Sequence, residues 1–141
     1  MEELLDISTE FGARAQRRLE EEIAAWLTTV GRDGTPQPNP VWFIWEDQTL
    51  LIYSKPGQAK LRNIERNPNV AFHLDGDAGG DVVVVTGAAT ADREALAIDR
   101  HPAYVEKYRK DIVRIGYPDA ALMAADYSVA IRIVPRKIRG F

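Results

Sequence analysis

The stretch of sequence that decides the fold is Tyr53-Ser54-Lys55-Pro56-Gly57-Gln58-Ala59-Lys60-Leu61-Arg62-Asn63-Ile64. It follows a strand-like run at 49–53 and leads into a short helix expected over about 57–66. The strand end and the helix start bring several anion-binding groups together: the Ser54 hydroxyl, unpaired backbone N–H groups, the positive end of the helix dipole and Lys60. The predicted ligand is a phosphate or another polyanionic group.

The composition of the chain limits the classes of protein to consider. The chain has 141 residues and a net charge of −3, with a pI of about 5.4. This length predicts one domain, residues 1–141. The acidic balance argues against a general nucleic-acid binder, whose surface would be broadly basic. There is no Cys, and His73 and His101 are the two histidines, so no metal site or Ser-His triad is expected.

The start of the chain bears on the compartment. Met1-Glu2-Glu3 lacks the basic start and the apolar core of a signal peptide, and no apolar run approaches the length of a membrane span. We therefore expect a cytoplasmic protein.

The pattern along the chain predicts a mainly β fold with peripheral helices. Ser8 or Thr9 can cap a helix over about 8–25, where apolar residues recur at helical spacing. The remaining elements are expected as helices over 57–66, 101–115 and 119–125, and as strands over 25–30, 41–45, 49–53, 70–74, 81–93 and 128–134. Short strands in hairpins, with a helical excursion before the last strand, predict a small antiparallel barrel with helices outside it.

Two strands carry an excess of apolar surface. Val82–Val85 is a continuous apolar run, which predicts a strand buried on both faces. Together with the aromatic-rich strand at 41–45, it exceeds what one barrel of this size would cover, so part of it is expected in a subunit interface. Pro36, Pro38 and Pro40 alternate, which is typical of an edge strand. They could equally expose that edge to a flat ring.

These segments together resemble a known family. The resemblance rests on 36–43, 51–54, 60–70, 102–109, 127–133 and the Arg-Gly-Phe end. From about residue 20 to the C-terminus the chain resembles the pyridoxamine-phosphate-oxidase-like split β-barrel superfamily. Within it, the chain resembles branch B of the flavin/deazaflavin oxidoreductases, which is associated with coenzyme F420-dependent enzymes of actinobacteria.

The resemblance implies a homodimer of six-stranded antiparallel split barrels, with two cofactor sites in grooves between the subunits. It places the cofactor phosphate near Ser54, Lys55 and Lys60, and the tricyclic ring against the strand 39–42. The cofactor-binding residues that it implies are Asn39, Pro40, Val41, Trp42, Ser54, Lys55, Ala59, Lys60 and Asn63.

Departures from the family pattern bear on the choice of cofactor. Pyridoxamine-phosphate oxidases proper carry Arg-x-Val-Leu-Leu-Lys on the second strand, where this chain has Asn39-Pro40-Val41-Trp42-Phe43-Ile44. They also carry Arg before the phosphate-binding Lys, where this chain has Ala59. The missing cations disfavour tight FMN binding and vitamin B6 oxidation. The resemblance therefore implies coenzyme F420 as the first choice and FMN as the alternative.

The implied chemistry requires few specific catalytic side chains. A reduced deazaflavin donates a hydride, so the protein need only bind it, exclude water and hold an electron-poor acceptor such as a conjugated carbonyl, quinone or tetrapyrrole. Lys55, Arg62 and Arg66 are candidates for contacts with the polyglutamyl tail of the cofactor. The catalytic residue stays unassigned, because the proton could come from solvent or from a tyrosine at position 53, 104 or 108. A non-catalytic carrier of a cofactor or a haem-type ligand is a further alternative.

Each candidate residue also has a purely structural interpretation. Lys60 and Arg62 could form a solvated helix face, Trp42 could be core, and Ser54 could simply end a strand. His73 is expected to be structural or interfacial rather than catalytic, and His101-Pro102 to be a helix start.

Overall fold

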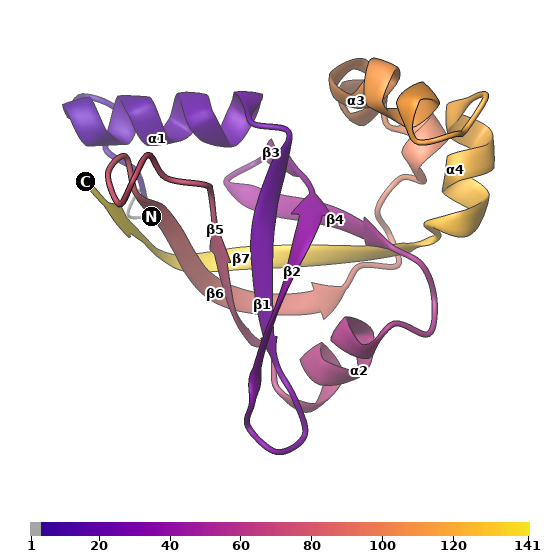
Figure 1. The fold of residues 1–141 in the computed structure, drawn as a ribbon, viewed down its shortest axis with the longest axis horizontal. Helices are drawn as coiled ribbons and strands as arrows, with labels where there is room; N and C mark the ends of the chain where they lie inside the picture. The colour runs from indigo at the N-terminus through magenta and orange to yellow at the C-terminus, as the bar shows by residue number, and fades with distance from the viewer. Residues whose placement is uncertain (1–3) are drawn as a thin grey trace.

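The computed structural model describes residues 4–141, and this part forms seven strands, four α-helices and one 3₁₀ turn (Figure 1). Met1-Glu2-Glu3 lies outside the described residues. The strands are β1 (Ala24–Val30), β2 (Pro36–Trp42), β3 (Ile44–Glu46), β4 (Thr49–Ser54), β5 (Asn69–His73), β6 (Val83–Ala91) and β7 (Val129–Gly140). The helices are α1 (Glu10–Glu21), α2 (Ala59–Arg66), α3 (Pro102–Arg114) and α4 (Ala120–Asp126), and the 3₁₀ turn is Ile98–Arg100. Within residues 4–141, no helix combines the length and apolar character needed to span a membrane.

All seven strands form one antiparallel sheet in the order β2-β1-β5-β6-β7-β4-β3. Its two edge strands, β2 and β3, are consecutive in the chain and are separated only by Phe43. The chain therefore joins the two edges of the sheet, and the sheet curls into a half-barrel of the split-barrel type. The expected single strand at 41–45 breaks at Phe43, which accounts for seven strands where six were expected.

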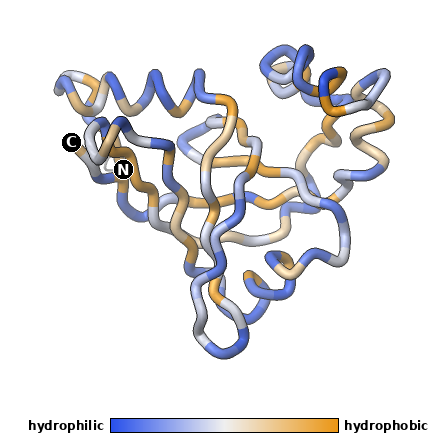
Figure 2. Tube along the Cα trace, viewed as in Figure 1, coloured by the Kyte–Doolittle hydropathy of each residue, from blue (hydrophilic) through white to orange (hydrophobic). Residues whose placement is uncertain are grey.

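The helices lie at the ends and on the outside of the sheet. Figure 1 shows α1 at the same end as the C-terminus, and α3 and α4 together at the opposite end. Hydrophilic residues dominate α1 and the turn between β1 and β2, whereas the strands carry most of the apolar residues (Figure 2). Arg14 and Arg18 of α1 form ion pairs with Asp81, at 2.7 and 3.2 Å. These contacts hold α1 against the segment that precedes β6.

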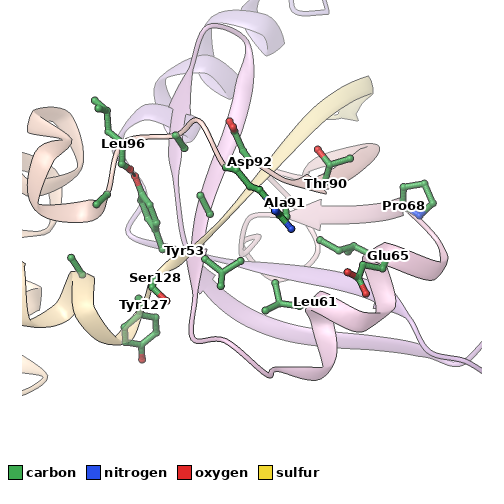
Figure 3. A pocket seen from close by; sticks show the side chains of 17 residues that line it. Tyr53, Leu61, Glu65, Pro68, Thr90, Ala91, Asp92, Leu96, Tyr127 and Ser128 are labelled. Atoms are coloured by element: carbon green, nitrogen blue, oxygen red, sulfur yellow. Dashed lines mark hydrogen bonds between the residues drawn. The ribbon is translucent and has the colours of Figure 1, made fainter.

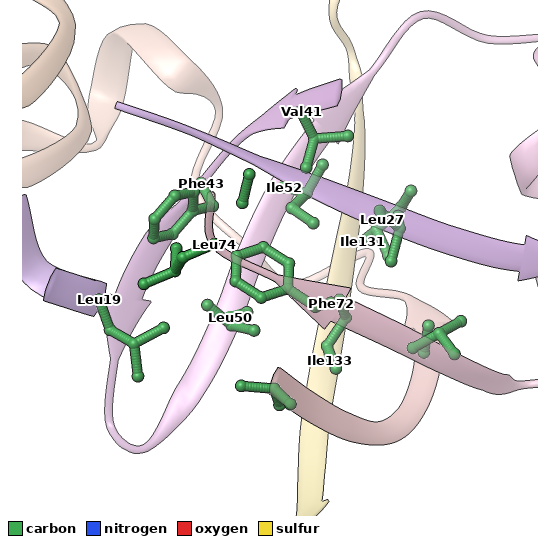
Figure 4. Packing of buried hydrophobic residues seen from close by; sticks show 14 of the residues in the cluster. Leu19, Leu27, Val41, Phe43, Leu50, Ile52, Phe72, Leu74, Ile131 and Ile133 are labelled. Atoms are coloured by element: carbon green, nitrogen blue, oxygen red, sulfur yellow. The ribbon is translucent and has the colours of Figure 1, made fainter. Parts of the chain in front are cut away.

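The inside of the half-barrel is filled by apolar side chains of β1, β2, β4, β5, β6 and β7, and the partly buried Trp45 of β3 packs against them (Figure 4). Phe43 and Phe72 meet edge to face, with ring centroids 5.0 Å apart. Along β6, Val83 and Val85 point inward and are buried, whereas Val84 on the other face is only half-buried. Within a single chain, 82–85 is therefore not buried on both faces as predicted, because no helix of the described chain covers that outer face.

Two element boundaries differ from the sequence-based expectation. Thr9 caps α1 by accepting a hydrogen bond from the Gly12 N–H at 2.9 Å, but the helix ends at Glu21 because Ala24 already pairs with Trp42 in the sheet. Strand β7 continues to Gly140 instead of ending at Val134. It passes Pro135 by a register shift opposite Gly87, where a side chain would meet a backbone carbonyl at 2.3 Å.

A second cluster packs α3 and α4 against the outer face of β3, β4 and the start of β7. Side chains of helix α3 also form hydrogen bonds with the backbone at Phe43, where the strand breaks. The Tyr108 hydroxyl accepts a hydrogen bond from the Phe43 N–H at 2.8 Å and lies within donating distance of the carbonyls of Ile23, 2.7 Å, and Phe43, 2.9 Å. Lys107 donates to the Phe43 carbonyl at 2.9 Å, with its ammonium 3.9 Å from the Phe43 ring centroid. These contacts satisfy the N–H and carbonyl of Phe43, which lie between β2 and β3 at the strand break.

The position of Lys107 predicts a pH dependence of stability. Burial lowers the pKa of Lys107 from 10.5 to about 8. Between these values the unfolded chain binds more protons at this lysine than the folded chain, so its contribution to the free energy of unfolding increases as pH rises through this window. We expect Lys107→Met to abolish that increase. Urea unfolding of both proteins across the window measures it, and parallel pH profiles would contradict the assignment. The tyrosines are present in both proteins, so their contribution to the pH dependence cancels in the comparison.

Candidate functional site

A pocket of about 300 Å³ opens on the outer face of β2. Four predicted site residues line it: Pro40, Val41, Trp42 and Lys60. The other lining residues are Ala24, Tyr53, Tyr104, Ile115, Met123 and Tyr127. Strand and helix residues far apart in the sequence thus meet at one site, which we call the Trp42 pocket.

The predicted ring-binding residues lie on two faces of the sheet, because side chains alternate along a strand. Pro40 and Trp42 pair with Trp26 and Ala24 of β1 and share the outer face of the sheet. Asn39 pairs with Leu27, so it lies on the opposite face and does not line the Trp42 pocket. The prolines of β2 occupy a strand that pairs on one side only, which confirms the edge-strand interpretation.

The predicted phosphate-binding residues also differ in their exposure and contacts. Ser54 is 1% exposed, and its hydroxyl donates to the Lys55 carbonyl at 2.8 Å. Lys55 is exposed, with its ammonium 5.4 Å from the Tyr127 ring centroid. Ala59 is exposed as the first residue of α2. Lys60 lines the Trp42 pocket, whereas Ser54, Lys55 and Ala59 do not.

Asn63 is committed to contacts within the protein. It is 3% exposed, and its amide nitrogen donates to Thr29 Oγ1 and to Gln37 Oε1, both at 2.9 Å. Its Oδ1 accepts a hydrogen bond from Arg66 at 2.8 Å. The side chain therefore ties α2 to β1 and β2, and it positions Lys60 indirectly by fixing that helix.

Lys60 is a half-buried cation without a partner among residues 4–141. None of the ion pairs in this part of the chain includes Lys60, and burial lowers its pKa. It lies in the first turn of α2, whose N-cap residue Gln58 makes no side-chain capping hydrogen bond. A half-buried ammonium at a helix start without a side-chain cap favours an anion.

Aromatic side chains form one wall of the Trp42 pocket. Trp42 stacks on Tyr108 with centroids 4.6 Å apart and planes 4° from parallel. Tyr104 packs against Tyr108 at 4.7 Å and meets Tyr53 edge to face at 5.0 Å. The Tyr53 hydroxyl donates to the Leu96 carbonyl. Burial, and then the charge of Glu46, raise the pKa of Tyr53 to about 12. An aromatic wall with one nearby cation suits a flat, anionic ligand.

A larger pocket of about 730 Å³ adjoins the first and shares Tyr53 and Tyr127 with it. It lies between α2, the end of β6, the segment 92–97 and the start of β7 (Figure 3). Sequence reasoning missed this pocket because its walls come from four segments that no local motif connects.

The two histidines have structural contacts. His101 is 8% exposed; its Nδ1 accepts a hydrogen bond from the Tyr104 N–H at 3.2 Å and caps α3, which confirms the expected helix start. Its Nε2 lies 2.6 Å from Glu46 Oε1. His73 lies on the outer face of the sheet, opposite Trp26 and Val84.

The sequence profile of the pyridoxamine 5′-phosphate oxidase family matches residues 11–141. The chain belongs to this family. A solved structure named an F420 reductase is 30% identical, with a TM-score of 0.62 over 88% of this chain and 94% of that one. No curated protein is significantly similar in sequence.

Two further solved structures share the family fold at lower identity. A conserved hypothetical protein of Mycobacterium tuberculosis is 24% identical, with a TM-score of 0.66 over 93% of this chain and 82% of that one. A Listeria innocua protein provisionally named a pyridoxamine 5′-phosphate oxidase is 22% identical, with a TM-score of 0.63 over 95% and 97% of the two chains.

The role of Asn63 can be tested by its effect on stability. Asn63→Ala leaves the buried Thr29 hydroxyl without its donor and removes the contact with the exposed Gln37 side chain. We therefore expect the free energy of unfolding to fall by about 1–3 kcal/mol, the range for an unsatisfied buried polar group. Glu65→Ala, an exposed change on the same helix, is the matched control. Urea unfolding measures both. Equal stability of the two variants would show that the Asn63 contacts are dispensable.

Proposed function

We propose that this protein is an oxidoreductase that uses the deazaflavin coenzyme F420 to reduce a small electron-poor organic molecule. The observation that carries the proposal is the Trp42 pocket, where an aromatic wall meets Lys60, a cation in no ion pair of the described residues 4–141. The similarity to a structure named an F420 reductase supports the choice of cofactor. When bound, the reduced cofactor would supply the hydride.

The residues of the Trp42 pocket fit the two ends of such a cofactor. Pro40, Val41 and Trp42 would hold the ring, because they offer apolar surface on an edge strand. Lys60 and the uncapped start of α2 would hold the phosphate. A bound phosphate would offset the burial that lowers the pKa of Lys60, so Lys60 would remain charged in the complex.

The charges around Lys60 favour F420 over FMN. Ala59 supplies no second cation beside Lys60, so the phosphate contacts are few. Lys55 and Arg62 are exposed on the same turn and helix, where they could meet the negative charges of a polyglutamyl tail. Arg62 and Arg66 are both partly used, because Arg62 donates to the Gly57 carbonyl at 2.9 Å and Arg66 donates to Asn63. FMN has no such tail and would gain nothing from the two exposed cations.

A second copy of the chain is part of the proposal. The outer face of the sheet carries the half-exposed apolar residues Trp26 and Val84 and the 54%-exposed Val134, which no helix of the described chain covers. We propose that a second copy packs on this face. Sedimentation velocity tests it, and a monomer at micromolar concentration would contradict it.

Parallel titrations with F420 and FMN test the proposed function. We expect the cofactor-free protein to bind F420 more tightly than FMN, followed by ligand fluorescence. Tighter FMN binding would favour an FMN-dependent enzyme of the same fold. If F420 binds but its reduced form is not oxidised by menadione in the presence of the protein, a cofactor carrier is favoured over an enzyme.

Removing the Lys60 charge should weaken cofactor binding in the same titration. We expect Lys60→Ala to reduce F420 affinity by about 1.5–3 kcal/mol, the range for hydrogen bonds to charged groups. Arg62→Ala removes an exposed cation from the same helix and is the matched control, with a smaller and more salt-dependent loss expected. Unchanged affinity in Lys60→Ala would show that Lys60 is an ordinary surface lysine.

A further inference from the structure

Tyr104 is almost entirely buried in the wall of the Trp42 pocket. Its side chain is 1% exposed and lies in the first turn of α3. The rings of Tyr108, at 4.7 Å, and Tyr53, at 5.0 Å, pack against it. The backbone N–H of Tyr104 donates to the capping residue His101 at 3.2 Å. Ring packing and backbone capping therefore hold the phenol in one place.

The hydroxyl of Tyr104 differs from those of its neighbours. Tyr53 donates to the Leu96 carbonyl, and Tyr108 is bonded to the backbone of Phe43. By contrast, no hydrogen bond within residues 4–141 uses the Tyr104 hydroxyl. Every fully enclosed side-chain oxygen and nitrogen in that part of the chain has a partner. The Tyr104 oxygen is therefore not fully enclosed, and Tyr104 lines the Trp42 pocket but not the larger one.

The Tyr104 hydroxyl is available to a ligand. A hydroxyl that no group of residues 4–141 uses gives the folded chain nothing that a Phe of the same volume would not, so its place beside the pocket favours a ligand. Burial, followed by the nearby Tyr108 and Tyr53, raises the pKa of Tyr104 well above its usual value. Tyr104 therefore stays protonated and acts as a donor to an oxygen rather than as a base.

We propose that Tyr104 donates a hydrogen bond to a carbonyl oxygen of a planar molecule bound in the Trp42 pocket. This inference rests on the proposed function and extends it, because it gives the ligand a conjugated carbonyl. The carbonyl can belong to the cofactor ring or to the hydride acceptor. In the acceptor case, the hydride bonds to the electron-poor carbon and an electron pair moves onto the carbonyl oxygen. The Tyr104 O–H stabilises that charge until water supplies the proton.

Tyr104→Phe tests the proposal, with Tyr117→Phe as the matched control. Tyr117 lines neither pocket, and its hydroxyl donates to Asp126 at 2.6 Å. Because the Tyr104 hydroxyl has no partner within residues 4–141, Tyr104→Phe should leave the thermal stability of the ligand-free protein unchanged or slightly higher. A purely structural hydroxyl would instead lower stability on removal.

Binding and turnover then distinguish the two sources of the carbonyl. If the oxygen belongs to the cofactor, F420 affinity should fall about 3–10-fold, the range for one hydrogen bond. If it belongs to the acceptor, F420 affinity should be unchanged and kcat for menadione reduction should fall about 10–100-fold, on the order of the loss of one oxyanion donor or somewhat less. The Tyr117→Phe protein should match the wild type in both measurements.

Two results would overturn the proposal. One is a Tyr104→Phe protein that binds F420 and menadione and reduces menadione as the wild type does. The other is a wild-type protein that binds none of F420, FMN and menadione. If the wild type binds menadione alone, the proposed function fails while Tyr104 is still tested, since Tyr104→Phe should then weaken menadione binding about 3–10-fold.

Discussion

The junction at Phe43 is the constraint on which the rest of the structure depends. This residue alone separates β2 from β3, the two edges of the sheet, so the curl of the sheet follows from the turn of the chain there. The Phe43 ring packs inside against Phe72, while its backbone binds Tyr108 and Lys107 outside. The same contacts hold α3 against β2. Together with the apolar cluster of α3, α4, β3 and β4, they support the wall of the Trp42 pocket.

Local signals in the sequence were sufficient for most of the fold. Asn67-Pro68 ends α2 where expected, and the alternating prolines occupy an edge strand. The run at 82–85 was misjudged because burial of an outer face depends on what packs on it, and apolar composition alone does not show that. The break at Phe43 was missed for a related reason. It is stabilised by α3, more than 60 residues away, and no turn signal interrupts the strand.

The site was predictable to a smaller extent. The resemblance placed Pro40, Trp42 and Lys60 at one cofactor site, and these three residues line the same pocket. Their role in binding stays a prediction. The sequence could not show that Asn63 is satisfied by Thr29 and Gln37, because partners 34 and 26 residues away depend on how α2 docks. Tyr104 of α3 was considered only as one of three possible proton donors, because its spacing from Tyr108 is equally typical of a core. The contribution of Met123 of α4 was hidden, since no local signal sets it apart.

The geometry of the outer face links the Trp42 pocket to the proposed subunit contact. Pro40 lines the pocket and pairs with Trp26, Trp26 pairs with His73, and His73 pairs with Val84. Paired residues in adjacent strands share a face, so these four side chains form one row across the sheet. A second copy that covers Val84 and Trp26 would therefore extend to the rim of the pocket at Pro40. Cofactor binding and association would then stabilise each other, because each would reduce the apolar surface that the other leaves exposed to water.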